Sequence, residues 1–179
     1  YSLSFDSSKG FDLLQSTLRA FGGYSYSTDQ RLIGGTVYPF HLRSISIGAG
    51  GTITPWPWLN FVISSGYSWN ISQTNDKLAQ TVRSATQRLK VNVYVTKQLT
   101  LAATVEDNYN NLTDENRHTW FGNATTKLKL KHIDLEFQLN NLFDQCQYTR
   151  VNYSGLDIYT HTSQLRPRNV VFSVRFKLL

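Results

Sequence analysis

Asp134 and Glu136 have the spacing that most resembles a catalytic pair. Two residues apart on an extended strand, their carboxylates point the same way about 7 Å apart, which could suit acid–base chemistry. Lys127, Lys129 and Lys131 fall on the same side of the preceding predicted strand. Lysines opposite carboxylates favour ion pairs across the strands over a proton-transferring acid. We therefore expect a structural role for this charged group.

Other reactive side chains are scattered. The histidines at positions 41, 118, 132 and 161 lack the i, i+4 spacing of a zinc helix, and Cys146 is the single cysteine. The sequence contains neither a GxSxG elbow nor an SxxK motif. We expect no catalytic residue, no metal ligand, no cofactor and no enzymatic activity.

The composition limits the remaining function classes. The net charge of +6 arises from 18 basic and 12 acidic residues spread along the chain, without a finger, helix-turn-helix or RNP pattern, so a nucleic-acid partner is not expected. Aromatic residues are abundant at 13%, and charged residues are sparse at 17%. No apolar run reaches the roughly 18 residues of a spanning helix. The chain is either soluble or crosses a membrane as strands.

Period-two alternation between turn residues predicts an all-β antiparallel fold of about eight strands. In the closing stretch, Val170, Phe172, Val174 and Phe176 share one face, and Arg175 and Lys177 share the other. Residues 1–10 are expected to be the end of an earlier strand plus a turn. The expected strands cover residues 14–26, 42–54, 58–71, 84–96, 99–109, 119–131, 133–141 and the alternating last ten residues of the closing stretch 165–179.

Three features favour a transmembrane β-barrel segment with a polar lumen over a soluble sheet. Short connections (TPWPW, TKQ, KHI) alternate with long ones, as short periplasmic turns alternate with long extracellular loops in outer-membrane barrels. The polar faces of residues 42–71 contain Ser, Thr, Gly and Asn. Aromatic residues gather near strand ends, at Trp56, Trp58, Tyr67, Trp69, Tyr109 and Trp120. In this arrangement the charged lumen-facing residues are Lys127, Lys129, Asp134, Glu136, Arg175 and Lys177.

Two motifs indicate a family. NNLFD (140–144) closes the penultimate expected strand, and LRPR (165–168) precedes the last. This ending resembles the C-terminal barrel of TonB-dependent outer-membrane receptors, especially those of Bacteroidota. Such receptors have roughly 22 strands around an N-terminal plug. No plug or TonB box is found in residues 1–179, so the resemblance implies a fragment or one piece of a split barrel.

The resemblance implies a location in the outer membrane of a Gram-negative bacterium and a function in active nutrient uptake. The implied partners are outer-membrane lipid, the remaining strands and plug on another chain, TonB acting through that plug, and a surface lipoprotein. In the segment 143–166, Tyr148, Tyr153 and Tyr159 are expected to form a recognition surface for sugars, peptides or proteins. Two alternatives stay open: an autonomous eight-stranded outer-membrane barrel with a structural or adhesive role, and a soluble lipocalin-like ligand-binding barrel. Pairing between the first and last strands would favour the autonomous barrel.

Overall fold

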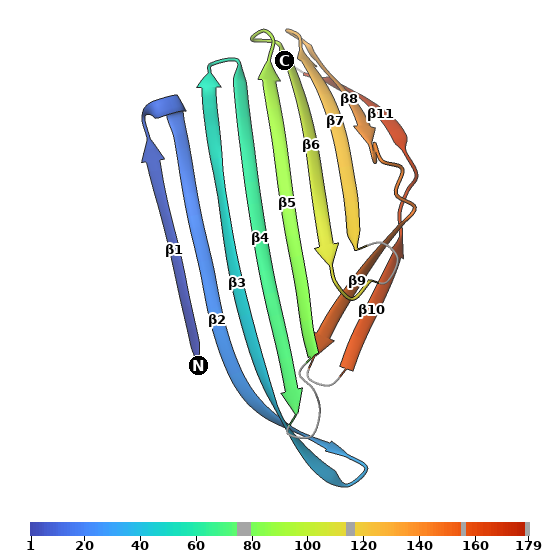
Figure 1. The fold of residues 1–179 in the computed structure, drawn as a ribbon. Coiled ribbons are helices and arrows are strands. Elements are labelled where there is room, and N and C mark those ends of the chain that lie inside the picture. The colour runs from blue at the N-terminus through green and yellow to red at the C-terminus, as the bar shows by residue number, and fades with distance from the viewer. Residues whose placement is uncertain (75–79, 114–116, 155–156, 178–179) are drawn as a thin grey trace.

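A computed structural model describes residues 1–74, 80–113, 117–154 and 157–177, without the side chains of residues 13, 31, 33 and 152–158. The described residues form an all-β structure whose nine-stranded antiparallel sheet has the order β1-β2-β3-β4-β5-β6-β7-β8-β11 (Figure 1). A separate ribbon pairs β9 with β10. The strands are β1 (Ser2–Phe11), β2 (Ser16–Ile33), β3 (Thr36–Trp56), β4 (Leu59–Thr74), β5 (Gln80–Tyr94), β6 (Leu99–Asn110), β7 (His118–Lys129), β8 (Ile133–Asn140), β9 (Gln147–Ser154), β10 (Asp157–Gln164) and β11 (Asn169–Phe176).

The eight expected strands correspond to β2–β8 and β11. The structure adds β1, which pairs with β2 from Ser2 opposite Ser25 to Phe11 opposite Ser16. The turn expected within residues 1–10 lies instead at residues 12–15, where Leu13–Gln15 form a single 3-10 turn. Among the described residues, no helix has the length and apolar character needed to cross a membrane.

Two expected loops are largely strands. Residues 27–41 continue β2 and β3 to a tight turn at Gly34 and Gly35, whose φ angles are +57° and +85°. Paired positive φ angles are typical of a type I′ hairpin turn, and glycine adopts them without steric cost. The segment 143–166 contains the ribbon of β9 and β10. In residues 27–41 the apolar residues stand next to one another instead of alternating, and β9 carries polar residues on both faces, so neither region shows a regular period-two pattern.

The register separates an apolar face from a polar face. Ile63 lies opposite Leu89, which lies opposite Val105, forming an apolar row across β4, β5 and β6. On the next row of the other face, Arg88 lies opposite Glu106. The same separation continues to the last strand, where Val174 lies opposite Leu135 of β8.

The apolar face is not covered by the chain's own described residues. Of the residues whose side chains the structure describes, only four apolar ones are buried, at positions 40, 82, 85 and 151, whereas Phe137, Phe172 and Phe176 are 44%, 63% and 68% exposed. The accessible surface is 12830 Å². A compact monomer of 20.5 kDa would expose about 8,900 Å². The sheet therefore lacks the enclosed core of a soluble barrel.

The sheet is open. Its order places β1 and β11 at opposite edges, and within the described ranges neither strand pairs along its outer side. Edge strands present unpaired backbone N–H and C=O groups that can accept another strand.

Candidate ligand-binding pocket on the polar face

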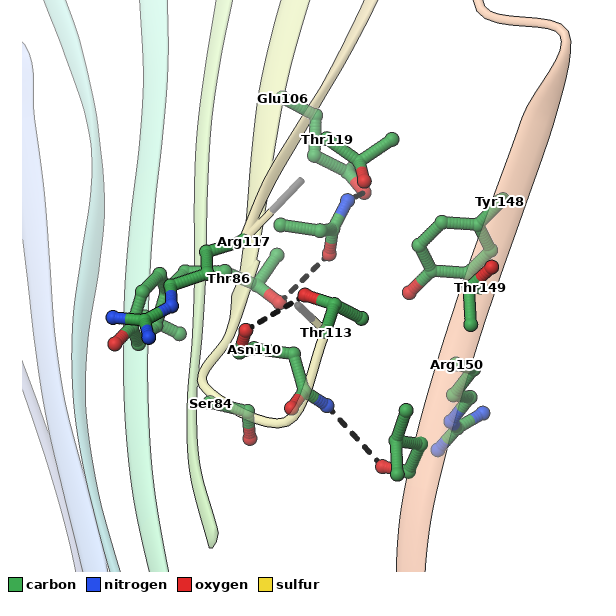
Figure 2. Close-up of a pocket in the computed structure, with 14 residues that line it drawn as sticks. Ser84, Thr86, Glu106, Asn110, Thr113, Arg117, Thr119, Tyr148, Thr149 and Arg150 are labelled. Atoms are coloured by element: carbon green, nitrogen blue, oxygen red, sulfur yellow. Dashed lines mark hydrogen bonds between the residues drawn. The ribbon is translucent and has the colours of Figure 1, made fainter. Parts of the chain in front are cut away.

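A pocket of about 390 Å³ lies between the polar face of β5 and β6 and the strand β9 (Figure 2). Its floor comes from β5 and β6, and one wall comes from residues 148–151 of β9. The strand β9, which forms this wall, lies toward the end of the sheet that carries the β2–β3 hairpin (Figure 1).

Hydrogen bonds between cross-strand neighbours organise the floor. Thr86 and Asn108 are register partners, and the Thr86 hydroxyl donates to Asn108 Oδ1 at 3.0 Å. Asn108 Nδ2 donates to Glu106 Oε1 at 2.8 Å. Arg88 Nε lies 3.8 Å from Glu106 Oε2. The Glu106 carboxylate is therefore held in place from two sides.

Asn110 connects the floor to the wall. Its Nδ2 donates to the backbone carbonyl of Val151 at 3.2 Å, and its Oδ1 accepts from the backbone N–H of Leu112 at 2.9 Å. Farther along β9, the Tyr148 ring meets the Phe121 ring of β7 edge-on, with centroids 5.5 Å apart. These contacts place β9 over the polar face.

The NNLFD and LRPR motifs meet each other and fix both ends of the segment that carries β9. Asn141 Nδ2 donates to the backbone carbonyls of Gln145 and Arg166, at 2.9 and 2.8 Å. The Asp144 carboxylate accepts from the backbone N–H of Arg168 at 2.8 Å. Asn141 and Asp144 have φ angles of +56° and +53°, a conformation that Asn and Asp tolerate better than most residues. We call this arrangement of Asn141, Asp144, Gln145, Arg166 and Arg168 the motif junction.

The pocket is suited to binding polar ligands. Arg117 and Arg150 line it, and within the part of the chain that the structure describes neither guanidinium has an ionic or hydrogen-bonded partner. Figure 2 shows Tyr148 on β9, across the pocket from Thr86 and Asn110. Amide, hydroxyl and guanidinium groups around the Tyr148 ring provide directional contacts to a ligand that carries hydroxyl or anionic groups.

The structure does not gather the three predicted tyrosines into this pocket. Tyr148 lines the pocket, but Tyr159 does not. Tyr159 lies on β10, where it is 55% exposed and is the register partner of Asn152 on β9. The Tyr153 side chain lies outside the described residues. Glu106 and Asn108 fall within the expected strand 99–109, but sequence reasoning assigned them no binding role. It gave no role to Arg117 or Arg150, because nothing in the sequence shows that β9 packs on β6.

The six charged residues that were assigned to the lumen all lie on the polar face. Lys127 Nζ is 3.2 Å from Glu136 Oε2, and Lys177 Nζ is 2.7 Å from Asp134 Oδ1. The expected ion pairing across neighbouring strands is therefore present. Lys129 and Arg175 are both register partners of Asp134, on β7 and β11 respectively.

One contact between an aspartate and a histidine lies on the apolar face. Asp107 is 7% exposed, and its Oδ2 lies 2.9 Å from His118 Nδ1. The Tyr109 ring packs against the His118 ring, with centroids 4.9 Å apart. The pair lies where β6 and β7 end, among the aromatic residues near the loops.

In comparisons with known proteins, the chain matches no protein-family model, no curated protein and no solved structure. The fold and the pocket therefore carry the functional argument.

Proposed function

We propose that this sheet is part of the wall of an outer-membrane β-barrel of the TonB-dependent receptor type. Its apolar face contacts lipid, and its polar face lines a hydrated lumen. The barrel imports a scarce nutrient into a Gram-negative cell, with energy from TonB transmitted through a plug outside this sheet. The observation that carries the proposal is the exposed apolar face of the nine-stranded sheet, behind a polar face with ion pairs and a pocket.

The dimensions of the apolar face support a membrane location. Trp56 and Trp58 stack at the β3–β4 turn, with ring centroids 5.4 Å apart, and Tyr67 and Trp69 pack at 4.6 Å farther along β4. The nine residue steps from Trp58 to Tyr67 extend about 30 Å, which a tilt of about 40° reduces to about 23 Å. The apolar band of an outer-membrane barrel is about 25 Å tall and is flanked by aromatic residues.

The connections support an orientation. Four short turns, at residues 12–15, 57–58, 95–98 and 130–132, lie at one end of the sheet (Figure 1). The opposite end carries the extended β2–β3 hairpin and the β9–β10 ribbon. Short turns face the periplasm in outer-membrane barrels, and longer segments face outward. In this orientation the pocket beside β9 faces incoming nutrient and supplies its first polar contacts.

The open edges favour this proposal over the two alternatives. An autonomous barrel would pair its first and last strands, whereas β1 and β11 lie at opposite edges. A lipocalin-like barrel would enclose the apolar face, yet Phe137, Phe172 and Phe176 are exposed. In our proposal further strands on another chain, or in a longer form of this one, close the barrel. Outer-membrane lipid, the plug, TonB and a surface lipoprotein are the other proposed partners.

Tryptophan quenching tests the membrane location. The purified protein is reconstituted into phosphatidylcholine vesicles with or without brominated acyl chains, and tryptophan emission is recorded. Because Trp56, Trp58, Trp69 and Trp120 lie near the ends of the apolar face, we expect brominated lipid to quench a large part of the emission. A protein that stays monodisperse without detergent and is not quenched would contradict the proposal.

Co-purification tests the transporter assignment separately. We expect the protein to fractionate with the outer membrane and, extracted with its native partners, to retain the periplasmic domain of TonB. An outer-membrane location without retention of TonB would support the autonomous barrel instead.

A further inference from the structure

A second cavity, of about 310 Å³, lies on the polar face where β7, β8 and β11 are neighbours. It lies toward the short-turn end, away from the pocket beside β9. Side chains of Lys127, Lys129, Asp134, Glu136, Ser173 and Arg175 line it. We call it the basic cavity.

Both carboxylates of the basic cavity already have cationic partners. Glu136 pairs with Lys127 at 3.2 Å and accepts a hydrogen bond from Gln138 Nε2 at 2.5 Å. Asp134 pairs with Lys177 at 2.7 Å. A metal cation would have to displace these lysines, so the cavity is poorly suited to one.

Two further cations of the basic cavity make no close ion pair of their own. Lys129 and Arg175 line the cavity, and across the described ranges neither side chain has an ion pair or hydrogen bond. Together with Lys127 and Lys177, the four cations exceed the two carboxylates by two positive charges.

The register brings the two unpaired cations to one place. Lys129 and Arg175 are both opposite Asp134, so they flank it from its two neighbouring strands. Two strand spacings separate their backbones by about 9.6 Å, a gap that two long side chains can bridge around one small ligand. The Ser173 hydroxyl lines the same cavity, and the planar Arg175 guanidinium has donors that match two oxygens of an oxyanion.

We propose that the basic cavity binds a compact divalent oxyanion of the phosphate class. Lys129 and Arg175 hold it from either side, and Ser173 donates a hydrogen bond. A divalent anion neutralises the two excess charges. The site is separate from the pocket beside β9, and its occupancy can be measured whether or not the protein is a transporter.

Calorimetric titration of the purified protein with inorganic phosphate, in zwitterionic detergent at low ionic strength, tests this site. We expect saturable binding to the wild type. Lys129→Gln and Arg175→Gln are each expected to weaken it at least about tenfold, the loss expected for one charge-assisted hydrogen bond. Lys97→Gln and Lys131→Gln remove one exposed cation each at the same end of the sheet but outside the cavity, and are expected to change it less than about twofold.

Three outcomes would overturn the proposal: no saturable binding by the wild type, equal losses in all four variants, or full binding by both cavity variants. Equal losses would indicate attraction by net charge alone. Circular dichroism spectra confirm that each variant keeps the sheet. If Arg175→Gln loses its fold, Lys129→Gln alone decides, because within the described residues the Lys129 side chain makes no ion pair or hydrogen bond that the substitution would remove.

Discussion

Arginine placed on the two faces of one strand tests the proposed sidedness directly. Ala124 and Thr125 are consecutive in β7, so their side chains point to opposite faces of the sheet. Ala124 lies opposite Ala103 and Leu139 on the apolar face. Thr125 lies opposite Gln138 on the polar face. The variants Ala124→Arg and Thr125→Arg therefore add the same charge at nearly the same height, one toward lipid and one toward the lumen.

The expected magnitude follows from the position of Ala124 along the strand. It is four residues from Trp120, about 14 Å along β7, or about 10 Å in height at a tilt of about 40°. That is close to half of the roughly 25 Å apolar band, and arginine at the midplane costs about 2–4 kcal/mol. At Thr125 the new guanidinium lies diagonally from Glu136 in the same polar face. A change there within about 0.5 kcal/mol is expected.

Denaturant unfolding in phosphatidylcholine vesicles, followed by tryptophan fluorescence, gives both free energies. The cost of Ala124→Arg should fall in bilayers of shorter acyl chains, because the headgroups then approach residue 124. An equal or larger cost for Thr125→Arg would refute the sidedness. If the loss in free energy of unfolding for Ala124→Arg does not change with bilayer thickness, protein and not lipid covers the apolar face.

Three further predictions concern the packing and turns. Gly48→Ala should lower the free energy of unfolding by about 1–3 kcal/mol, because the new Cβ would lie 2.9 Å from a backbone oxygen of β4 and would overlap the Phe21 ring. Gly66→Ala should be nearly neutral, because no described atom lies within 4 Å of the added Cβ. Equal effects of the two variants would contradict this packing. Asn141→Ala should lower the free energy of unfolding by about 2–3 kcal/mol, because the three side-chain hydrogen bonds that hold Gln145 and Arg166 in the wild type are lost. The same variant should make β9 and β10 more accessible to protease. An unchanged digestion pattern would argue against the motif junction. Gly35→Val should speed amide hydrogen exchange at the tip of the β2–β3 hairpin and nowhere else, because a β-branched residue is strained at a φ of +85°. Exchange at the tip that stays as slow as in the wild type would count against the assigned turn.

Alternation identified the strands that have one apolar and one polar row. In β8, Ile133, Leu135, Phe137 and Leu139 alternate with polar residues, and the observed register keeps these sets on separate faces. A slip of one residue would move every side chain to the wrong face, so the sequence strongly restricts the register of such strands.

The features that sequence reasoning missed depend on groups without a side-chain signal. QYTRVNYS of β9 has polar residues on both faces, so no periodicity distinguishes it from a loop. Its position over β6 depends on the backbone carbonyl of Val151, which any residue could supply. The sequence singled out NNLFD and LRPR separately, but the hydrogen bond from Asn141 to the Arg166 carbonyl could be seen only in the structure.

The motif junction makes the path of β8 and β11 independent of the β9–β10 insert between them. Because Asn141 and Asp144 fasten residues 145, 166 and 168, the chain leaves β8 and enters β11 at fixed points whatever lies between them. Sequence changes in β9 and β10 can therefore alter the proposed pocket without shifting the pairing of β8 with β11. The β9–β10 insert can therefore be replaced during evolution without changes in the neighbouring strands, and a foreign recognition hairpin can be grafted at the same place.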